Sequence, residues 1–204
     1  MSSIAGIHRK DGRAVQEEEL QQVMDALHHW EADGRQELSE GPTGMGHLML
    51  FNTPESMHEK LPFRDPESGL MITADARIDN RQKLMGNLNL DRPENQYLPD
   101  SQLILSAYKK YGHRCLDHLT GAFAFAIFDP TRDEIFCARD HMGFKPFFYH
   151  DQGDMFLFAT EIKGIKAHPA VNLTENELFI ADAISTLKSE KDQTFYRSEE
   201  RRVG

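Results

Sequence analysis

The order of the expected elements predicts an α+β protein. Strands and amphipathic helices are mixed before residue 112, and four short apolar runs follow one another between residues 121 and 161. Such a mixture, without a regular strand–helix repeat, is typical of α+β domains. The 204 residues, 39% of them hydrophobic, allow one ordinary domain, or one domain with part of a second.

The first half of the chain combines short strands with one clear helix. Residues 4–8, 46–51 and 70–76 are apolar enough to predict strands, whereas residues 33–44 are rich in glycine and predict a loop. Residues 17–30 predict a helix, because their apolar side chains recur at steps of three and four and share one face. These side chains are Leu20, Val23, Met24, Leu27 and Trp30.

Three further helices are expected. A short helix over 80–85 should stop at Gly86, and a longer one over 101–111 should be capped by the Asp100 carboxylate. Thr174 and Glu177 form a capping-box pattern ahead of a last helix that reaches residue 188.

The four apolar runs predict consecutive antiparallel strands joined by tight turns. They span residues 121–129, 133–140, 146–151 and 154–161. The first run alternates small and large side chains, so its small face should meet another layer closely while its large face fills a core. The small residues are Ala122, Ala124 and Ala126, and the large ones are Phe123, Phe125 and Ile127.

Composition excludes several classes of function. The formal net charge of −10 argues against a nucleic-acid partner, because neutralising phosphates requires a basic surface. The longest apolar run, residues 121–128, is far shorter than the ~20 residues that span a bilayer. The first residues show no secretory signal. We therefore expect neither nucleic acid nor a membrane as partner.

Cysteine and histidine usage points to a reducing compartment without a metal centre. Cys115 and Cys137 are the only cysteines, which fits the cytoplasm, although two cysteines allow one disulfide. The ten histidines lack metal-ligand spacing. We expect a cytoplasmic protein and no metal site.

Ser2 is a candidate nucleophile. Cells remove an initiator Met that precedes a small residue, which would leave Ser2 at the N-terminus. An N-terminal serine can act as nucleophile while its own α-amine serves as the base. Many proteins begin Met-Ser, so the dipeptide alone does not establish this role. The strand expected at residues 4–8 would hold such a nucleophile on a rigid element.

Several segments resemble one family in order along the chain. Residues 1–7, MSSIAGI, resemble the MCGIAGI start of class II glutamine amidotransferases of the asparagine synthetase family. Residues 121–150 resemble the family's GxFAFAxxD…ARDxxGxKPLYY block, and residues 158–169 resemble its SEIKAL segment. Residues 100–112 are similar to the helix that follows the family's D(C/T)E motif. The resemblance implies a four-layer αββα sandwich of antiparallel sheets, the fold of the N-terminal nucleophile hydrolases.

The resemblance also locates the family's functional positions, and most of them differ. Ser2 stands where the family has its catalytic cysteine, and serine is the weaker nucleophile near neutral pH. Met49 replaces the arginine that grips the glutamine carboxylate. Asp100 matches the aspartate that binds the substrate's α-amino group.

The family motif NGEIYN is replaced by residues 75–80, DARIDN. Asp75 and Ala76 stand where an asparagine and a glycine form the oxyanion hole, and Arg77 stands where a glutamate binds the substrate amine. Asp75 would oppose a developing oxyanion, and Arg77 would repel an ammonium group. The resemblance therefore implies a domain that no longer hydrolyses glutamine.

Changes of this kind resemble β-lactam synthetases and lasso-peptide cyclases. In these relatives a glutaminase-like N-terminal domain supports a C-terminal synthetase domain that adenylates a carboxylate for attack by an amine. The resemblance implies such a synthetase domain as partner, and it leaves a homodimer open. ATP and Mg are expected as cofactors of the synthetase domain only, and no cofactor is expected for the glutaminase-like domain. The whole protein is thus expected to be an ATP-dependent carbon–nitrogen ligase, and this part alone inactive.

Two alternative functions stay open. In the first, Ser2 hydrolyses glutamine to supply ammonia for asparagine synthesis. In the second, the chain is a free-standing interaction module.

The domain limits are also expectations. We expect the domain to cover residues 1–188 and a linker to the synthetase domain to begin at 189–196. Residues 197–204, RSEERRVG, resemble a translated sequencing adapter and are expected to be an artefact. Whether the ligase substrate is ammonia or an intramolecular amine stays open.

Overall fold

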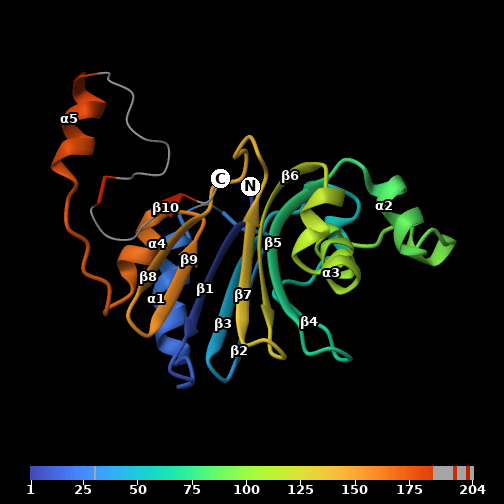
Figure 1. Ribbon diagram of the computed structural model, residues 1–204, viewed down its shortest axis with the longest axis horizontal. Helices are drawn as coiled ribbons and strands as arrows, with labels where there is room; N and C mark the ends of the chain where they lie inside the picture. Colours follow the sequence, from blue (N-terminus) through green and yellow to red (C-terminus); the bar gives the residue numbers. More distant parts are fainter. Residues whose placement is uncertain (30, 186–194, 197–200, 203–204) are drawn as a thin grey trace.

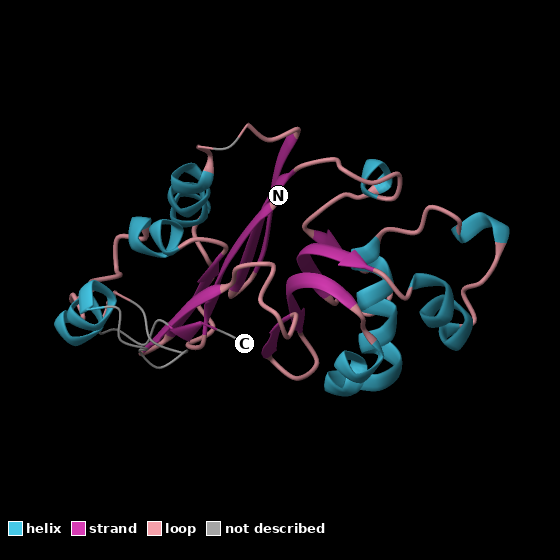
Figure 2. Cartoon of the chain, turned by 90° about the horizontal axis from the view of Figure 1, so that it is seen from above, coloured by secondary structure: helices cyan, strands magenta, loops and turns pink. Residues whose placement is uncertain are grey.

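The computed structural model describes residues 1–29, 31–185, 195–196 and 201–202. Two antiparallel sheets pack face to face, and helices cover both outer faces (Figures 1 and 2). The predicted four-layer αββα sandwich is therefore confirmed. Within the described residues, no helix is long and apolar enough to cross a membrane.

The described strands form a six-stranded and a four-stranded sheet. The first has the order β10-β8-β9-β1-β3-β2, and the second has the order β4-β5-β6-β7. In the first sheet the strands are β1 Ser3–Arg9, β2 Gly34–Glu40, β3 Thr43–Met49, β8 Phe148–Gln152, β9 Met155–Ala159 and β10 Arg201–Arg202. In the second they are β4 Phe63–Arg64, β5 Met71–Ile78, β6 Gly121–Asp129 and β7 Glu134–Arg139.

Each sheet carries its own helices on its outer face. Apolar clusters join α1 and α4 to the first sheet, and α2 and α3 to the second. The helices are α1 Glu17–Leu27, α2 Arg81–Leu88, α3 Asp100–Tyr111, α4 Ile162–Ala167 and α5 Glu177–Ser185, with short 3₁₀ helices η1 Ser56–His58, η2 Pro93–Asn95 and η3 Gly112–His118. Helix α5 buries none of its residues and stands away from the sandwich in Figure 1.

The alternation in β6 determines how the sheets stack. The large side chains of Phe123, Phe125 and Ile127 pack toward the helices α2 and α3. Ala124 and Ala126 face the other sheet, together with Phe128 near the end of the strand. Small side chains let the two sheets approach closely. The predicted division between a small and a large face is thus confirmed.

The predicted run of four consecutive strands is wrong in one respect. Strands β6 and β7 form a hairpin in the second sheet, whereas β8 and β9 form one in the first. The chain crosses between the sheets over residues 140–147. The carboxylate of Asp140 holds this crossing by accepting the backbone N–H groups of Phe123, Phe144 and Lys145, at 3.1 to 3.2 Å. Turn signals mark where a strand ends but not which sheet receives the next one.

Local expectations failed at two elements. Residues 33–44 contain the edge strand β2, which escaped the sequence analysis because it is polar and exposed along much of its length. Gly86 lies inside α2 instead of ending it, and the helix terminates at Asn89 in the left-handed conformation, with a φ of 58°.

The predicted helix caps also need correction. Asp100 is the first residue of α3 and its carboxylate caps nothing there; Pro99 is the N-cap. At α5 the side chain of Asn176, not that of Thr174, accepts the N–H of Phe179 at 3.2 Å.

Some predictions fall outside the described residues. This applies to Trp30, to residues 186–188 of the last helix and to most of the predicted linker and artefact over 189–204. Of that segment, residues 195–196 and 201–202 are described, and β10 pairs with β8. The domain limits therefore stay predictions.

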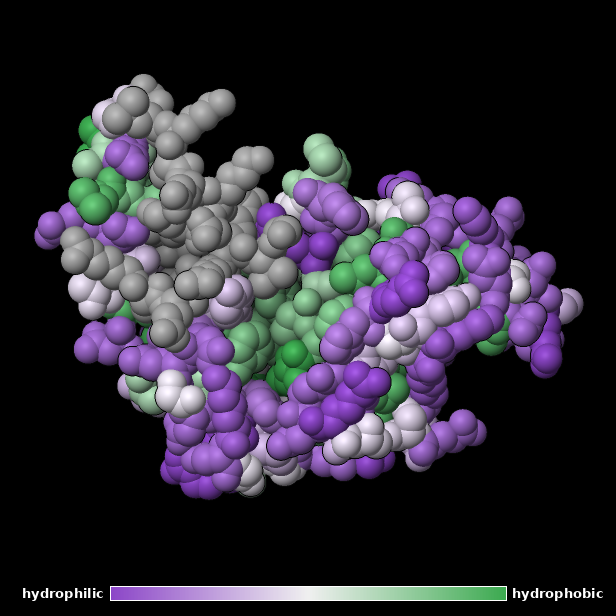
Figure 3. All heavy atoms as spheres, in the orientation of Figure 1, coloured by the Kyte–Doolittle hydropathy of each residue, from purple (hydrophilic) through white to green (hydrophobic). Residues whose placement is uncertain are grey.

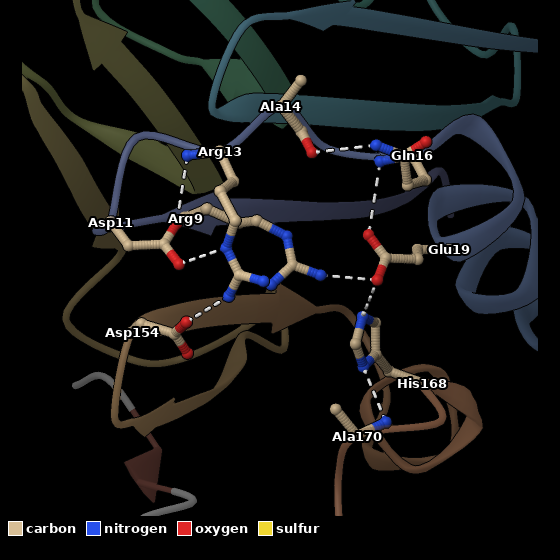
Figure 4. Close-up of polar contacts among 9 residues, drawn as sticks. All are labelled: Arg9, Asp11, Arg13, Ala14, Gln16, Glu19, Asp154, His168 and Ala170. Carbon is tan, nitrogen blue, oxygen red and sulfur yellow. Dashed lines mark hydrogen bonds and ion pairs between the residues drawn. The ribbon is translucent and has the colours of Figure 1, made fainter.

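One partly buried cluster, here called the Arg9 cluster, joins three elements at the end of β1 (Figure 4). It consists of Arg9, Glu19 of α1 and His168 after α4. Arg9 pairs with Glu19, and His168 Nε2 lies 3.8 Å from the same carboxylate. The N–H of Ala170 donates to His168 Nδ1 at 3.2 Å. Burial lowers the pKa of His168, so a neutral imidazole fills this position.

Candidate functional site

Five of the six predicted site residues line one cavity of about 250 Å³. The cavity lies where the start of β1, the end of β3 and the middle of β5 come together. The residues are Ser2, Met49, Asp75, Ala76 and Arg77. Folding therefore gathers positions from three separate segments, as the resemblance requires. The roles assigned to them stay predictions.

Ser2 is buried at the cavity, with 7% of its surface exposed. Antiparallel pairing sets Ser3 opposite Leu48 and so brings Ser2 close to Met49. The N–H of Leu50 donates to Ser2 Oγ at 3.1 Å, and Met49 Sδ lies 4.0 Å from the same oxygen. The hydroxyl is thus held by the backbone on one side and covered by a thioether on another.

Asp75 forms a buried ion pair with Lys145. Lys145 Nζ lies 2.8 Å from Asp75 Oδ1, and the side chains are 16% and 9% exposed. The second oxygen, Asp75 Oδ2, is buried without a hydrogen-bond partner among the described residues. Burial raises the pKa of Asp75, while the ammonium groups of Lys145 and of the N-terminus oppose that shift. The Ser2 backbone also lowers the pKa of Asp75, so the cavity wall contains a buried carboxylate whose charge is offset by nearby donors and cations.

Glu59 is a second carboxyl group at the cavity that the sequence analysis missed. Its Oε1 accepts the N–H of Ser101 at 3.1 Å. Burial raises the pKa of Glu59 to about 7, and the carboxylates of Asp100 and Asp75 add to this shift. Glu59 lies in a proline-punctuated segment without periodicity, so no local signal marks it.

Lys145 was also missed, although it lies within the segment that carries the strongest family resemblance. Its position in GFKPFF gives no hint of Asp75 as partner, because the two residues are 70 positions apart. Resemblance to the KP motif was the one signal available for it. The remaining lining residues are Leu50, Asn52, Ser56, Ala74 and Ala122.

The structure does not bring Asp100 into the lining of this cavity. Its carboxylate pairs with Arg81 and accepts the N–H of Ile78 at 3.2 Å. Burial raises the pKa of Asp100, and Arg81 opposes the shift. Arg77 does line the cavity, but its side chain is 72% exposed and pairs with Asp79 at 3.1 Å.

The two cysteines lie apart from this site. Both thiols are free, so the disulfide that two cysteines would have allowed does not form. Burial raises the pKa of Cys115 to about 11, and burial also raises the pKa of Cys137. Neither thiol has the lowered pKa of a reactive cysteine.

Two face-to-face antiparallel sheets between helical layers, with a hydroxyl side chain at the start of an inner strand, define the class of the N-terminal nucleophile hydrolase fold. The chain belongs to the glutamine amidotransferase domain family, whose model matches residues 1–201.

Relatives with this domain are larger proteins. A putative glutamine-hydrolysing asparagine synthetase 2 of Methanocaldococcus jannaschii is 32% identical over 194 residues, which cover 86% of this chain and 37% of that protein. Asparagine synthetase 3 of Bacillus subtilis is 39% identical over 137 residues, 61% of this chain and 22% of that protein. This chain therefore spans much less than half the length of these relatives and corresponds to their N-terminal glutamine amidotransferase part.

Solved structures agree on the fold. The glutamine phosphoribosylpyrophosphate amidotransferase of B. subtilis, complexed with ADP and GMP, matches with a TM-score of 0.62. It is 17% identical, and the match covers 81% of this chain and 43% of that one. At this identity the likeness establishes the architecture and nothing about the reaction.

Proposed function

We propose that this domain has lost glutamine hydrolysis and serves as the structural N-terminal domain of an ATP-dependent, amide-forming ligase related to asparagine synthetases. The observation that carries the proposal is the Asp75–Lys145 ion pair inside the cavity beside Ser2. The proposal concerns this domain's activity, because its membership of the family is established by the match above.

The ion pair is unsuited to amide hydrolysis. Attack on an amide carbon puts negative charge on the carbonyl oxygen, and hydrogen-bond donors aimed at that oxygen supply most of the stabilisation. Asp75 Oδ2 is an acceptor, so it would repel the oxyanion. The ammonium of Lys145 is already engaged with Asp75 Oδ1 at 2.8 Å.

Met49 supports the same conclusion from the substrate side. A glutamine carboxylate needs a cationic or hydrogen-bonding partner once it leaves water. Met49 provides neither, and its sulfur lies 4.0 Å from Ser2 Oγ. Serine also requires a stronger base than a thiol before it can attack.

The rest of the proposed protein follows from the relatives. A C-terminal synthetase domain would bind ATP and Mg, activate a carboxylate and join it to an amine, which is either ammonia or an amine of the same substrate. This domain would support the synthetase domain by packing against it. We also propose a cytoplasmic location, which the two free thiols support.

One observation favours an active glutaminase instead. Ser2 Oγ lies at the cavity wall directly before strand β1, where the family nucleophile is expected. On this alternative, Ser2 hydrolyses glutamine and the ammonia serves asparagine synthesis.

Ammonia release separates the two functions. The purified chain, with removal of Met1 checked by mass spectrometry, is incubated with glutamine beside a Ser2→Ala variant. We expect both proteins to release ammonia at the same background rate. Release by the unmodified chain that Ser2→Ala abolishes would overturn the proposal. Circular dichroism of both proteins ensures that folded chains are compared.

A further inference from the structure

We infer that helix α5, Glu177–Ser185, is an element through which this domain docks on the synthetase domain of the same polypeptide. The inference rests on the proposed function, which supplies that synthetase domain as the partner. It assigns the contact to one side of the helix, which is formed by Leu178, Ala181 and Ile184 and is here called the α5 row.

Helix α5 has the composition of a buried helix but is exposed. Six of its nine residues are apolar, and they lie on all sides of the helix. A helix that is hydrophobic all round is normally buried. Yet α5 buries none of its residues, and Leu178 and Ile184 are 73% and 79% exposed. In Figure 3, apolar side chains lie open where Figure 1 places α5. The described part of the domain thus leaves uncovered a helix whose sequence calls for cover.

The two sides of the helix differ in their surroundings. Phe179 contacts Phe195 edge to face, with 5.0 Å between the ring centres, so this side is covered from within the chain. The α5 row lies on another side, because its residues follow one another at steps of three. All three of its residues are exposed. The α5 row is therefore the side that a partner would cover.

The start of α5 is anchored to the rest of the domain. The N–H of Asn176 donates to the carbonyl of Phe195 at 2.8 Å, and Glu175 forms a β-bridge with Tyr196. Lys166 of α4 lies 5.4 Å from the centre of the Tyr196 ring. These contacts orient the helix at its base while its outer side stays open. Such an arrangement suits an element that presents a surface to a partner.

The length of α5 also calls for packing. Isolated helices shorter than about 12–15 residues are marginal in water, and most helices in proteins are stabilised by packing of an apolar face. With nine residues, α5 falls below this length. None of its residues belongs to the apolar clusters of the described residues. The sandwich therefore supplies little of the packing that this helix needs.

The relatives indicate the partner. The matched part makes up 37% and 22% of the two asparagine synthetases, and the rest of each protein follows that part. Helix α5 is the last helix of the described residues, so a domain that follows in the chain would lie close to it.

The size of α5 favours this partner over a second copy of the chain. Stable interfaces between separate proteins use about 20–30 residues on each side, whereas α5 has nine. A domain in the same polypeptide needs a smaller contact, because the covalent connection keeps its effective concentration high.

Charge favours a protein over a membrane surface. Helices that lie on membranes carry Lys and Arg on their polar face. The described residues of α5 include the acidic Glu177 and Asp182 and no basic residue. A partner that fits α5 therefore offers an apolar groove with basic side chains at its rim.

Hydrogen exchange tests the docking. Exchange of the α5 amides is measured by mass spectrometry in this chain and in the full-length protein encoded at its source locus. We expect fast exchange in this chain, because an exposed helix opens readily, and exchange at least about tenfold slower in the full-length protein. Equal exchange in the two proteins would overturn the inference.

Two matched variants of the full-length protein test the side of the helix. Ala181→Asp places a charge in the α5 row, whereas Ala183→Asp makes the same change on the side of Phe179, four positions before it. Ala181→Asp should remove the slow exchange of α5, and Ala183→Asp should keep most of it. Equal exchange in the two variants would refute the assigned side.

The same two variants of this chain serve as a control for folding. Both alanines are exposed here, so the two variants should have the same urea midpoint. A lower midpoint in Ala181→Asp alone would mean that the α5 row packs within this domain, which would overturn the inference.

Other occupants of the α5 row give distinct results. Sedimentation velocity of this chain and its Ala181→Asp variant detects a second copy, and flotation with vesicles of phosphatidylcholine and phosphatidylglycerol detects a membrane. We expect that Ala181→Asp changes neither result. A dimer or a vesicle complex that this variant disrupts would overturn the inference. A source locus that encodes no synthetase domain would contradict the proposed function as well, whereas an encoded synthetase domain that leaves α5 in fast exchange would contradict the present inference alone.

Discussion

Charged groups shielded from solvent lie at both ends of β1, partly buried at its last residue and buried beside its first, and they do different things. At its last residue, the Arg9 cluster joins β1 to α1 and to the segment after α4 through one carboxylate, Glu19 (Figure 4). Before its first residue, the Ser2 cavity contains the Asp75–Lys145 pair and open space, and one buried oxygen of Asp75 has no hydrogen-bond partner among the described residues.

The difference shows what distinguishes a structural ion cluster from a site. In the Arg9 cluster the paired side chains come from β1 and α1, which pack directly against each other. The ion pair therefore lies within the contact that holds these two elements together. At the Ser2 cavity the start of β1, the end of β3 and the middle of β5 border open space, so the Asp75–Lys145 pair lies beside a hollow instead of within a fully packed contact. A buried ion pair is therefore weak proof of a structural role on its own.

Breaking the cavity's ion pair should have the largest effect. Lys145→Met removes the cation that contacts the buried Asp75 carboxylate, and we expect the free energy of unfolding to fall by about 4 kcal/mol. Urea denaturation measures this change. Adding Asp75→Asn should recover part of the loss, while Lys10→Met at the exposed Lys10–Asp151 pair should cost less than about 1 kcal/mol. A similar cost for both lysines would refute the comparison.

Breaking the Arg9 cluster should cost somewhat less. Glu19→Gln removes the charge that faces Arg9 but keeps oxygen and nitrogen atoms for hydrogen bonds, so we expect a loss of about 3 kcal/mol. The measurement is the same denaturation experiment, with exposed Glu18→Gln as the matched control. Equal stability of the two variants would show that Arg9 finds sufficient solvation without Glu19.

The pH dependence of stability should single out the cavity. The pKa of Glu59 is about 7 in the folded chain and 4.5 in its ordinary state, so the folded state binds more protons between these values. The free energy of unfolding of the wild type should therefore fall as pH rises from 4.5 to 7, because ionising Glu59 costs more in the folded chain than in the unfolded one. Glu59→Gln should match the wild type at pH 4.5 and exceed it by about 2 kcal/mol at pH 8, a figure reduced for partial exposure of Glu59. A constant difference across this range would contradict the shifted pKa.

Ser2→Ala should have the smallest effect on stability. The variant leaves the N–H of Leu50 without the Ser2 Oγ acceptor, which should lower the free energy of unfolding by about 1 kcal/mol. Thermal melting measures the change, and ammonia release should not alter. A loss as large as that of Lys145→Met would mean that Ser2 anchors the cavity wall, not only one backbone group.

The sequence by itself determined the elements whose reasons are local. The three- and four-residue spacing in α1 predicted the face that buries Leu20, Val23 and Met24. The alternation in β6 predicted which side chains face the other sheet. The resemblance located five residues that do line one cavity, because an aligned motif carries the fold's geometry with it.

Only the tertiary structure decided the pairings between distant segments. It assigned β8 and β9 to the first sheet and placed Glu59 at the cavity. It also paired Lys145 with Asp75, 70 positions away, and Asp100 with Arg81. Periodicity reports which face of an element is buried, but it does not report what that face meets. A charge finds its partner only once remote segments are packed together, and the desolvation that shifts the pKa of Glu59 exists only in that packed state.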